Sequence, residues 1–471
     1  MMTSSESASI TSLVLTGTID ARDFKFIRDN IPNLSELDLS TITIQSYNGS
    51  NGTIDASTSY PANGLPQNAF RNSDCSANVT LKAVALPASI TSIGMKAFEG
   101  CTGLTNLILP KSVNSIGNYA FFGCTGLTSL SIPDAVTTIG TYAFTSCTNL
   151  TVITLPGSLT SIGDWAFGNC NALIRINMPK SIKTIGNYAF YGCSGLSSLE
   201  LPATASSIGE SAFACCTGIT SFTMPDSVNT IQNNVFANCY QLKNVTLSKA
   251  ITSIGNWAFL GCTSLSGVTI PETVTSIGNG AFYDCTALSS LTIPNAVTTI
   301  GENALFNCAN LSNLTIGTSV STINNYAFGD CTNLSTINML LTTPITVVST
   351  IFFSVDKSVC TLNVPKTSIT AYQAASVWKE FYNIAAVPAE LGSQTDQSAI
   401  CVYPNPFTDG FFIKGFEGTG WLTLSDLSGK LLVRQPIIAG AFVSVNWLPK
   451  GVYLAKLTMA NGNFESKLLK E

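Results

Sequence analysis

The sequence contains no histidine among its 471 residues. Histidine is the commonest general base and metal ligand at neutral pH, so its absence removes the usual centre of an acid–base or metal site. The carboxylates are scattered, as at Asp134, Asp164 and Glu210, and no two recur side by side at a fixed spacing. The glycines form no phosphate-binding GK[ST] loop. We therefore expect no enzyme, with no catalytic residue, cofactor or metal site.

Charge is also scarce in this chain. Charged residues make up 10% of it, the net charge is -5, and the basic residues form no cluster. This composition argues against a nucleic-acid partner. No apolar run of membrane-spanning length occurs, so no membrane span is expected. The polar residues at the start lack the apolar segment of a signal peptide, which predicts that the sequence as given carries none.

Cysteine, by contrast, is abundant and regular. Of 15 cysteines, eleven return at a fixed interval of 23 residues. These are Cys101, Cys124, Cys147, Cys170, Cys193, Cys216, Cys239, Cys262, Cys285, Cys308 and Cys331. A fixed period in this range is typical of a solenoid, in which each repeat forms one coil and contacts only its neighbours.

Apolar residues keep the same interval around each cysteine. A leucine, or once Ile219, lies three residues after it, and an isoleucine lies eight residues before it. The full spacing matches neither a helix nor a strand and predicts one coil with seven inward side chains. The segment with Leu104, Leu107 and Leu109 predicts a short strand, which a proline ends in most repeats. Glycine after the invariant isoleucine, as at Gly94, marks a second bend.

This pattern resembles the bacterial BspA-like class of leucine-rich repeats, most clearly in LTSLSIPDAVTTIGTYAFTSC at 127–147. The resemblance implies a mainly β fold, a curved leucine-rich-repeat solenoid with a parallel sheet on its concave face and capped ends. It also implies a secreted or cell-surface protein. Some relatives are adhesins that bind host matrix proteins, whereas others have no known ligand.

The cysteine column has two interpretations. One is a disulfide framework or a set of metal sites, and the other is a column of buried thiols that pack as small apolar side chains. We favour buried thiols because eleven is an odd number and a disulfide would have to repeat at every pair. Cys215 takes a position held elsewhere by Gly123 or Gly192 and is expected to face outward. A disulfide between Cys215 and Cys216 stays open.

The period also divides the chain into parts. The predicted domains are an N-terminal cap with degenerate first repeats (1–74), the solenoid (75–342), a C-terminal cap (343–387), a polar linker (388–400) and a β-sandwich (401–471). Amphipathic spacing predicts a helix over 21–30 in the first cap. A second helix is expected over 368–381, where it would close the last coil.

The region 401–471 differs from the repeats. Its alternating strands and Gly and Asn turns predict about seven short strands of a small β-sandwich. Four motifs are notable here: Tyr403-Pro404-Asn405-Pro406, Asp426-Leu427-Ser428-Gly429-Lys430, Leu448-Pro449-Lys450-Gly451-Val452-Tyr453 and Lys467-Leu468-Leu469-Lys470. They resemble the C-terminal sorting domain of type IX secretion substrates in Bacteroidetes. The resemblance implies export by that machinery, usually with removal of the domain and attachment to the cell surface.

Residues five and seven positions after each cysteine should point away from the core of the predicted strand. These positions are neutral and rich in hydroxyl groups, and Arg175 and Glu200 are their only charges. One row contains Thr223, Thr246, Thr269, Thr292 and Thr315. Solenoids commonly bind partners on such a face. Serine and threonine are also ordinary residues of exposed strands, so both interpretations stay open.

An aromatic row lies five residues before four consecutive cysteines. Its members are Tyr119, Tyr142, Trp165 and Tyr188. A small alanine that should be buried follows each of them, so the rings are expected to be at least partly exposed. They could form an interaction patch or shield the seam between coils by packing, and we favour packing.

Together these observations predict a secreted or cell-surface repeat protein. We expect its solenoid to bind an extracellular protein or polysaccharide, as an adhesin does, and residues 401–471 to engage the type IX secretion machinery. The alternative is a structural surface-coat component without a specific ligand. A surface enzyme would require two acids to converge in one pocket.

Overall fold

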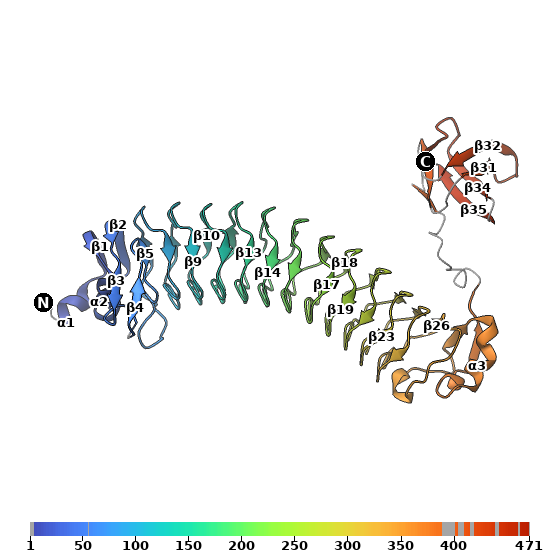
Figure 1. The fold of residues 1–471 in the computed structure, drawn as a ribbon, viewed down its shortest axis with the longest axis horizontal. Helices are drawn as coiled ribbons and strands as arrows, with labels where there is room; N and C mark the ends of the chain where they lie inside the picture. The colour runs from blue at the N-terminus through green and yellow to red at the C-terminus, as the bar shows by residue number, and fades with distance from the viewer. Residues whose placement is uncertain are drawn as a thin grey trace. The chain divides into compact units, whose positions relative to one another are not determined.

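The computed structural model describes residues 4–54, 56–388, 401–403, 409–414, 419–438, 442–459 and 462–470. The chain forms two compact units, Met1–Val387 and Pro388–Glu471. The first unit is a curved spiral of stacked coils (Figure 1), and the second is a small β domain. The linker predicted over 388–400 lies outside the described residues apart from Pro388.

One part of most coils contributes a short parallel strand to what we call the first sheet; two neighbouring coils have only the isolated bridge between Arg175 and Ser198 there. In β12 (Val152–Thr154), Ile153 is buried while its two neighbours are exposed. Ile153 pairs with Leu130 of β10 (Ser129–Ser131), one coil earlier. The other strands of this sheet in the coils are β6 (Ala83–Ala85), β8 (Asn106–Leu107), β16 (Ser221–Thr223), β18 (Asn244–Thr246), β20 (Gly267–Val268), β22 (Ser290–Ile293), β24 (Asn313–Ile316), β26 (Thr336–Met339), β27 (Thr361–Val364) and β28 (Asn383–Ala386).

A second set of parallel strands, the second sheet, ends at the invariant isoleucines. A β-carbon on Gly163, just after one of them, would lie 2.8 Å from the carbonyl oxygen of Ile139 in the preceding coil, so this bend requires glycine. The strands are β5 (Gly64–Leu65), β7 (Ser92–Ile93), β9 (Ser115–Ile116), β11 (Thr138–Ile139), β13 (Ser161–Ile162), β14 (Thr184–Ile185), β15 (Ser207–Ile208), β17 (Thr230–Ile231), β19 (Ser253–Ile254), β21 (Ser276–Ile277), β23 (Thr299–Ile300) and β25 (Thr322–Ile323).

Two columns of side chains fill the spiral. The phenylalanines that lie three residues before the cysteines stack from coil to coil, with ring centroids 5.1 Å apart between Phe121 and Phe144. The column of cysteines lies beside them, and Cys147 Sγ donates to the carbonyl of Phe121 at 3.1 Å. The cysteines from Cys75 to Cys360 are free thiols, and those of the 23-residue series are buried. The prediction of buried thiols in this column is confirmed.

The N-terminal cap is built around one helix, α2, which the sequence predicted. Asp20 begins it with a capping box, and Phe24 and Ile27 are buried against the first coils. The elements of the cap are α1 (Ser4–Ser9), β1 (Ser12–Ile19), α2 (Ala21–Asn30), β2 (Glu36–Ile44), β3 (Tyr47–Gly49) and β4 (Thr58–Tyr60). Strand β1 pairs with β2, and β2 pairs with β6, so the first sheet runs without a break from the cap into the coils.

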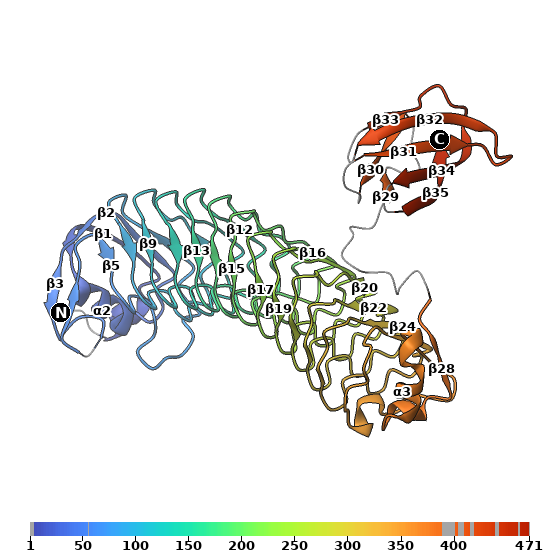
Figure 2. The same ribbon diagram turned by 45° about the vertical axis from the view of Figure 1, so that its right-hand side comes forward.

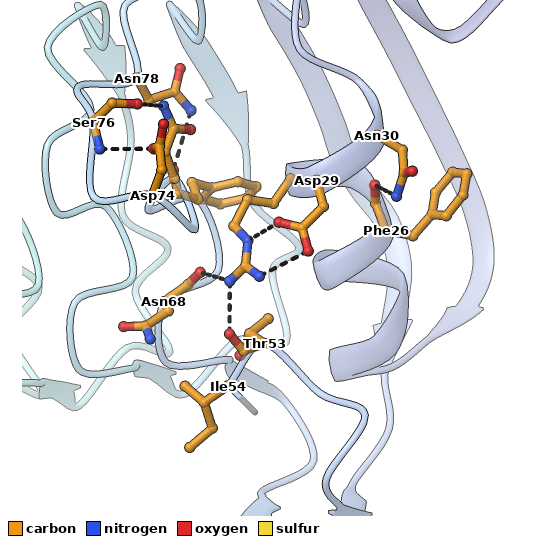
Figure 3. Close-up of polar contacts among 12 residues, drawn as sticks. Phe26, Asp29, Asn30, Thr53, Ile54, Asn68, Asp74, Ser76 and Asn78 are labelled. Atoms are coloured by element: carbon orange, nitrogen blue, oxygen red, sulfur yellow. Dashed lines mark hydrogen bonds and ion pairs between the residues drawn. The ribbon is translucent and has the colours of Figure 1, made fainter. Parts of the chain in front are cut away.

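A buried arginine ties α2 to the first coil. Arg28 donates to both carboxylate oxygens of Asp29, at 2.6 and 3.1 Å. Its Nη1 also donates to the carbonyl oxygens of Thr53, at 2.7 Å, and of Asn68, at 3.2 Å. Figure 3 shows Asp29, Thr53 and Asn68 converging on this group. The Arg28 side chain is only 5% exposed, so its charge depends on these partners.

The C-terminal cap differs from the prediction of one helix over 368–381. The structure has four short helices, η1 (Ser349–Phe352), η2 (Lys366–Ser368), α3 (Ile369–Ala374) and η3 (Trp378–Glu380). Val377 breaks the expected helix with a φ of 68°. The break lets Trp378 donate to the carbonyl of Ile345 at 2.8 Å while Tyr372 donates to that of Leu341 at 3.1 Å. Figure 2 shows α2 and α3 at opposite ends of this unit.

The second unit contains seven antiparallel strands in its described residues. They are β29 (Cys401–Tyr403), β30 (Gly410–Lys414), β31 (Thr419–Ser425), β32 (Leu431–Ile438), β33 (Phe442–Ser444), β34 (Gly451–Met459) and β35 (Gly462–Lys470). One sheet has the order β29-β30-β33 and the other β32-β31-β34-β35. Their inner faces bury a separate apolar core that includes Phe411, Leu422 and Leu457.

Candidate partner-binding surfaces

The first candidate surface is the outer face of the first sheet, by which we mean the face that points away from the apolar core of the spiral. Parallel pairing sets Thr223 against Thr246 and Thr292 against Thr315, so these two pairs of the row predicted from sequence are in register. Adjacent strands lie about 4.8 Å apart, which places the hydroxyl groups at a regular interval. Thr315 is half-buried and the other four threonines of the row, including Thr269, are exposed. The row can offer hydrogen bonds to an extended ligand.

The two charged residues of this face lie in coils that precede the threonines, and Glu200 occupies the threonine row's position one coil before Thr223. Arg175 and Glu200 are both exposed. Arg175 pairs through its backbone with Ser198 of the next coil. Across the residues that the structure describes, no ion pair joins these two side chains. Both charges are therefore available to a partner.

Sequence reasoning missed a groove on the same face. It has a volume of about 630 Å³ and is lined by β8, β10 and β12 and the residues around them. Ile108 is 77% exposed and Val152 is 55% exposed, and both line it together with Ser131. The sequence did carry a signal for this groove, because Ile108 and Val152 are aliphatic residues in rows that are otherwise rich in hydroxyl groups. The groove combines apolar and hydrogen-bonding contacts.

The second candidate surface is the aromatic row, in which the rings stack on one another. Ring centroids are 4.6 Å apart between Tyr119 and Tyr142, 5.8 Å between Tyr142 and Trp165, and 4.6 Å between Trp165 and Tyr188. All four side chains are half-buried. Lys96 lies over the outer face of Tyr119, with its Nζ 5.1 Å from the ring centroid.

The backbone of the aromatic row is in the left-handed region. The φ angles of Tyr119, Tyr142, Trp165 and Tyr188 lie between 55° and 59°. This conformation is unfavourable for bulky residues. Other coils have different residues at this position with a similar φ, such as Ser211 at 53° and Gly280 at 57°. The turn therefore imposes this backbone on whichever residue is present, and in the aromatic row four consecutive bulky residues carry its cost.

The stacking geometry limits what the aromatic row can bind. Each inner ring has a neighbouring ring parallel to each of its faces, as Tyr142 has between Tyr119 and Trp165. A sugar ring stacks on an open aromatic face, and these faces are already occupied within the chain. The row therefore favours packing between coils over a flat binding platform.

Side-chain amides and carboxylates beside the aromatic row also link the coils. Asn187 Oδ1 accepts the backbone N–H of Glu210 at 2.8 Å, and Asp164 Oδ1 accepts that of Asn187 at 2.7 Å. The same bond recurs further along the spiral, where Asn256 Oδ1 accepts the backbone N–H of Asn279 at 2.8 Å. These residues lie six positions before the cysteines, and the sequence reasoning did not single them out. Their role is to satisfy backbone groups.

The exposed cysteines differ from the buried column. Cys75 is exposed, and Arg71 Nη2 donates to its sulfur at 2.8 Å. Cys215 is half-buried at a φ of 60°, in the glycine-like position that the sequence suggested. A hydrogen bond with Cys215 raises the pKa of Tyr191. Cys215 and Cys216 are both free thiols.

Comparison with known proteins gives the family. The sequence matches the BspA type leucine rich repeat region, in 6 copies, over residues 63–194, 172–273 and 252–377. The chain belongs to this family. Its members are repeat proteins, which are typically not enzymes. The predicted fold class, a mainly β leucine-rich-repeat solenoid followed by a small β domain, is confirmed.

Solved structures of leucine-rich-repeat proteins resemble this chain. A leucine-rich repeat protein from Bacteroides ovatus is 28% identical and covers 69% of this chain and 86% of its own, with a TM-score of 0.54. A leucine rich cell surface protein from Faecalibacterium prausnitzii is 23% identical over 70% of this chain and 88% of its own, with a TM-score of 0.43. A leucine rich repeat protein from T. pallidum is 31% identical over 37% of this chain and 77% of its own, with a TM-score of 0.31. None of the curated proteins matches.

The tail of this leucine-rich-repeat protein matches a second family. Residues 401–471 match the secretion system C-terminal sorting domain. The match indicates export by the type IX system to the cell surface or the extracellular space. In the described ranges, no helix combines the length and apolar character needed to span a bilayer.

Proposed function

We propose that this chain is a surface protein whose solenoid binds an extracellular protein or polysaccharide, as an adhesin does. The outer face of the first sheet is the proposed binding surface. It comprises the row Thr223, Thr246, Thr269, Thr292 and Thr315, the charges Arg175 and Glu200, and the groove beside Ile108 and Val152. The sorting domain supports an extracellular setting for this surface.

The observation that carries the proposal is the order of this face. Parallel pairing fixes the strands within runs of two to five, as it sets Thr223 against Thr246, and a continuous core holds the coils together. A rigid face loses little conformational entropy when it binds. A regular row of hydroxyl groups therefore suits a partner that is itself extended and repetitive.

A structural role without a specific ligand is the second candidate function. The aromatic row favours it, because Tyr119, Tyr142, Trp165 and Tyr188 use their ring faces within the chain. Such a stack stabilises a long spiral. A coat component would need only that stability, together with export.

A binding array separates the two functions. The full chain, folded as judged by circular dichroism, is applied to arrays of glycans and extracellular matrix proteins. Saturable binding that weakens in a Thr246→Lys/Thr269→Lys/Thr292→Lys variant supports the proposal. A blank array from folded protein favours the structural role.

The aromatic row has its own test on the same array. The variant Trp165→Ala/Tyr188→Ala removes two of the four rings. Binding that survives these substitutions assigns the row to packing. Binding that is lost while the fold persists would add the row to the binding surface.

A further inference from the structure

The sequence motifs of the sorting domain hold its own fold. Asp426 Oδ1 accepts the backbone N–H groups of Ser428, at 2.9 Å, and Lys430, at 3.0 Å, and so closes the turn between β31 and β32. Tyr453 donates to the carbonyl of Pro449. The buried Lys470 donates through Nζ to the carbonyl of Val445 at 2.9 Å. These contacts occupy particular atoms of the motifs, so a recognition surface has to use other groups, including the remaining side chains of the same motifs.

The outer face of the four-stranded sheet is divided into rows by the strand register. One row pairs Thr423 with Lys456 and Lys456 with Glu465, and the last two form an ion pair at 2.7 Å. This row is polar. The next rows towards the β31–β32 turn differ in character.

The rows near that turn are apolar. Leu431 pairs with Ser425 and Ser425 pairs with Leu454, while Val452 pairs with Leu469. Leu431 is 54% exposed, Leu469 41%, Val452 39% and Leu454 36%. Alternation places them opposite the domain core, which holds Tyr453 and Leu468 on the other face. We call Leu431, Val452, Leu454 and Leu469 the apolar corner.

Lysines surround the apolar corner. Lys467 lies beside Leu454 in the register. Lys430 directly precedes Leu431, and Lys450 lies two residues before Val452; both lysines are exposed. The only described acid near this end, Asp426, is held in the turn by Ser428 and Lys430. Among the described residues, lysines therefore predominate around this apolar centre.

We infer that the apolar corner is the surface by which the secretion machinery binds this domain, through an apolar pocket with acidic residues at its rim. The inference rests on the proposed export of the chain by the type IX system. Contiguous exposed apolar residues on a small domain mark interaction sites. Complementary charge at the rim would orient the domain and speed its capture.

A protein pocket fits this surface better than a lipid bilayer does. The corner lies on a sheet face, where the side chains of Val452 and Leu454 are less than half exposed. No described residue of this domain belongs to a helix that could lie in the surface of a bilayer. A bilayer binds such a sheet face weakly, because insertion scales with the apolar area that enters it. A matching pocket can cover the whole corner.

The test is surface delivery of the full chain in a bacterium that carries a type IX system. The variant Leu454→Thr/Leu469→Thr keeps strand-forming residues at both places. We expect it to reach the surface at least tenfold less than the parent chain and to accumulate in the periplasm. The matched control, Lys456→Thr/Glu465→Thr, changes the same two strands on the same face and should be delivered within twofold of the parent.

Charge reversal provides a second arm. Lys430→Glu/Lys450→Glu should also lower delivery several-fold, because the rim would repel acidic residues. Thermal melts of the purified variants establish that the domain still folds. Delivery of both corner and rim variants at the parent level would overturn the inference.

Further controls separate this inference from the proposed export. A chain without residues 401–471 that is still delivered would refute export through the tail. The purified chain is also tested for cosedimentation with phosphatidylglycerol vesicles and for self-association in analytical ultracentrifugation. Cosedimentation that the Leu454→Thr/Leu469→Thr change abolishes would assign the corner to lipid. Self-association that the same change abolishes would assign it to a second copy. Either result would overturn the docking to the machinery.

Discussion

Burial raises the pKa of the thiols of the cysteine column from Cys101 to Cys308 and so favours their neutral form. Burial raises the pKa of Cys147 and of Cys193 from 9.0 to about 12, because the apolar core cannot solvate a thiolate. The unfolded chain exposes the same thiols, which then ionise near pH 9. Above that pH the unfolded state binds fewer protons than the folded state, so the free energy of unfolding falls as the pH rises.

We therefore predict that alkali destabilises the spiral. The melting temperature should be highest below about pH 9 and should fall through the pH range up to about 12. Each thiol whose pKa burial raises in this way contributes about 1.4 kcal/mol per pH unit in that range. Circular dichroism melts between pH 7 and 11 measure this loss. The variant Cys147→Ala/Cys193→Ala should have a lower melting temperature at pH 7, and that temperature should fall less steeply as the pH rises. A parent chain with the same melting temperature at pH 7 and 11 would contradict the account.

The aromatic row makes a second prediction about single residues. Tyr142 has a φ of 58°, which glycine adopts without strain and alanine does not. Tyr142→Gly and Tyr142→Ala both lose the ring contacts with Tyr119 and Trp165. We expect the glycine variant to be more stable than the alanine variant by about 1 kcal/mol. Urea unfolding followed by fluorescence measures the difference, and an alanine variant of equal or greater stability would show that the backbone is not strained.

At the scale of elements, the N-terminal cap depends on Arg28. Replacing it by methionine leaves the carbonyls of Thr53 and Asn68 without this donor and removes the charge that pairs with Asp29. We expect the opening free energy of α2 to fall by about 2–3 kcal/mol. Hydrogen exchange of the α2 amides measures it directly. Arg22→Met serves as the control because the Arg22 side chain is 60% exposed; equal effects of the two substitutions would contradict this role of Arg28.

The repeated elements could be predicted from the sequence because one interval constrains every coil at once. Leucines and isoleucines such as Leu107 and Ile116 recur at fixed places, and both are buried where the spacing requires. The caps have no such repetition. The helix predicted up to Phe381 is broken at Val377, because the aromatic side chains around it must reach carbonyl groups of the last coils. No local pattern specifies that requirement.

The candidate surfaces could be predicted in part. The exposed threonine row followed from alternation along a strand, and the partial exposure of the aromatic row followed from the alanine after each ring. The left-handed backbone of that row had a signal in Gly280 and Asn303, which occupy the same position in other coils. The groove over Ile108 and Val152 depends on how coils stack in space, so spacing along the chain could not reveal its volume.

At the scale of the whole molecule, each of the two units has an apolar core of its own. The coils share one continuous apolar core, so the stability of the spiral is close to a sum over neighbouring coils. The sorting domain has its own core and need not contribute to binding. Substitutions on the outer face of the first sheet therefore leave both cores unchanged.

The measurement that tests the proposed binding most directly is the affinity of the full chain for the protein or glycan that the array selects. We predict that Thr246→Lys/Thr269→Lys/Thr292→Lys lowers this affinity at least tenfold. The control, Thr252→Lys/Thr275→Lys/Thr298→Lys, changes three exposed threonines at the same coil interval beside the second sheet, and it should bind as the parent does. An unchanged affinity of the first variant would contradict binding through the outer face of the first sheet.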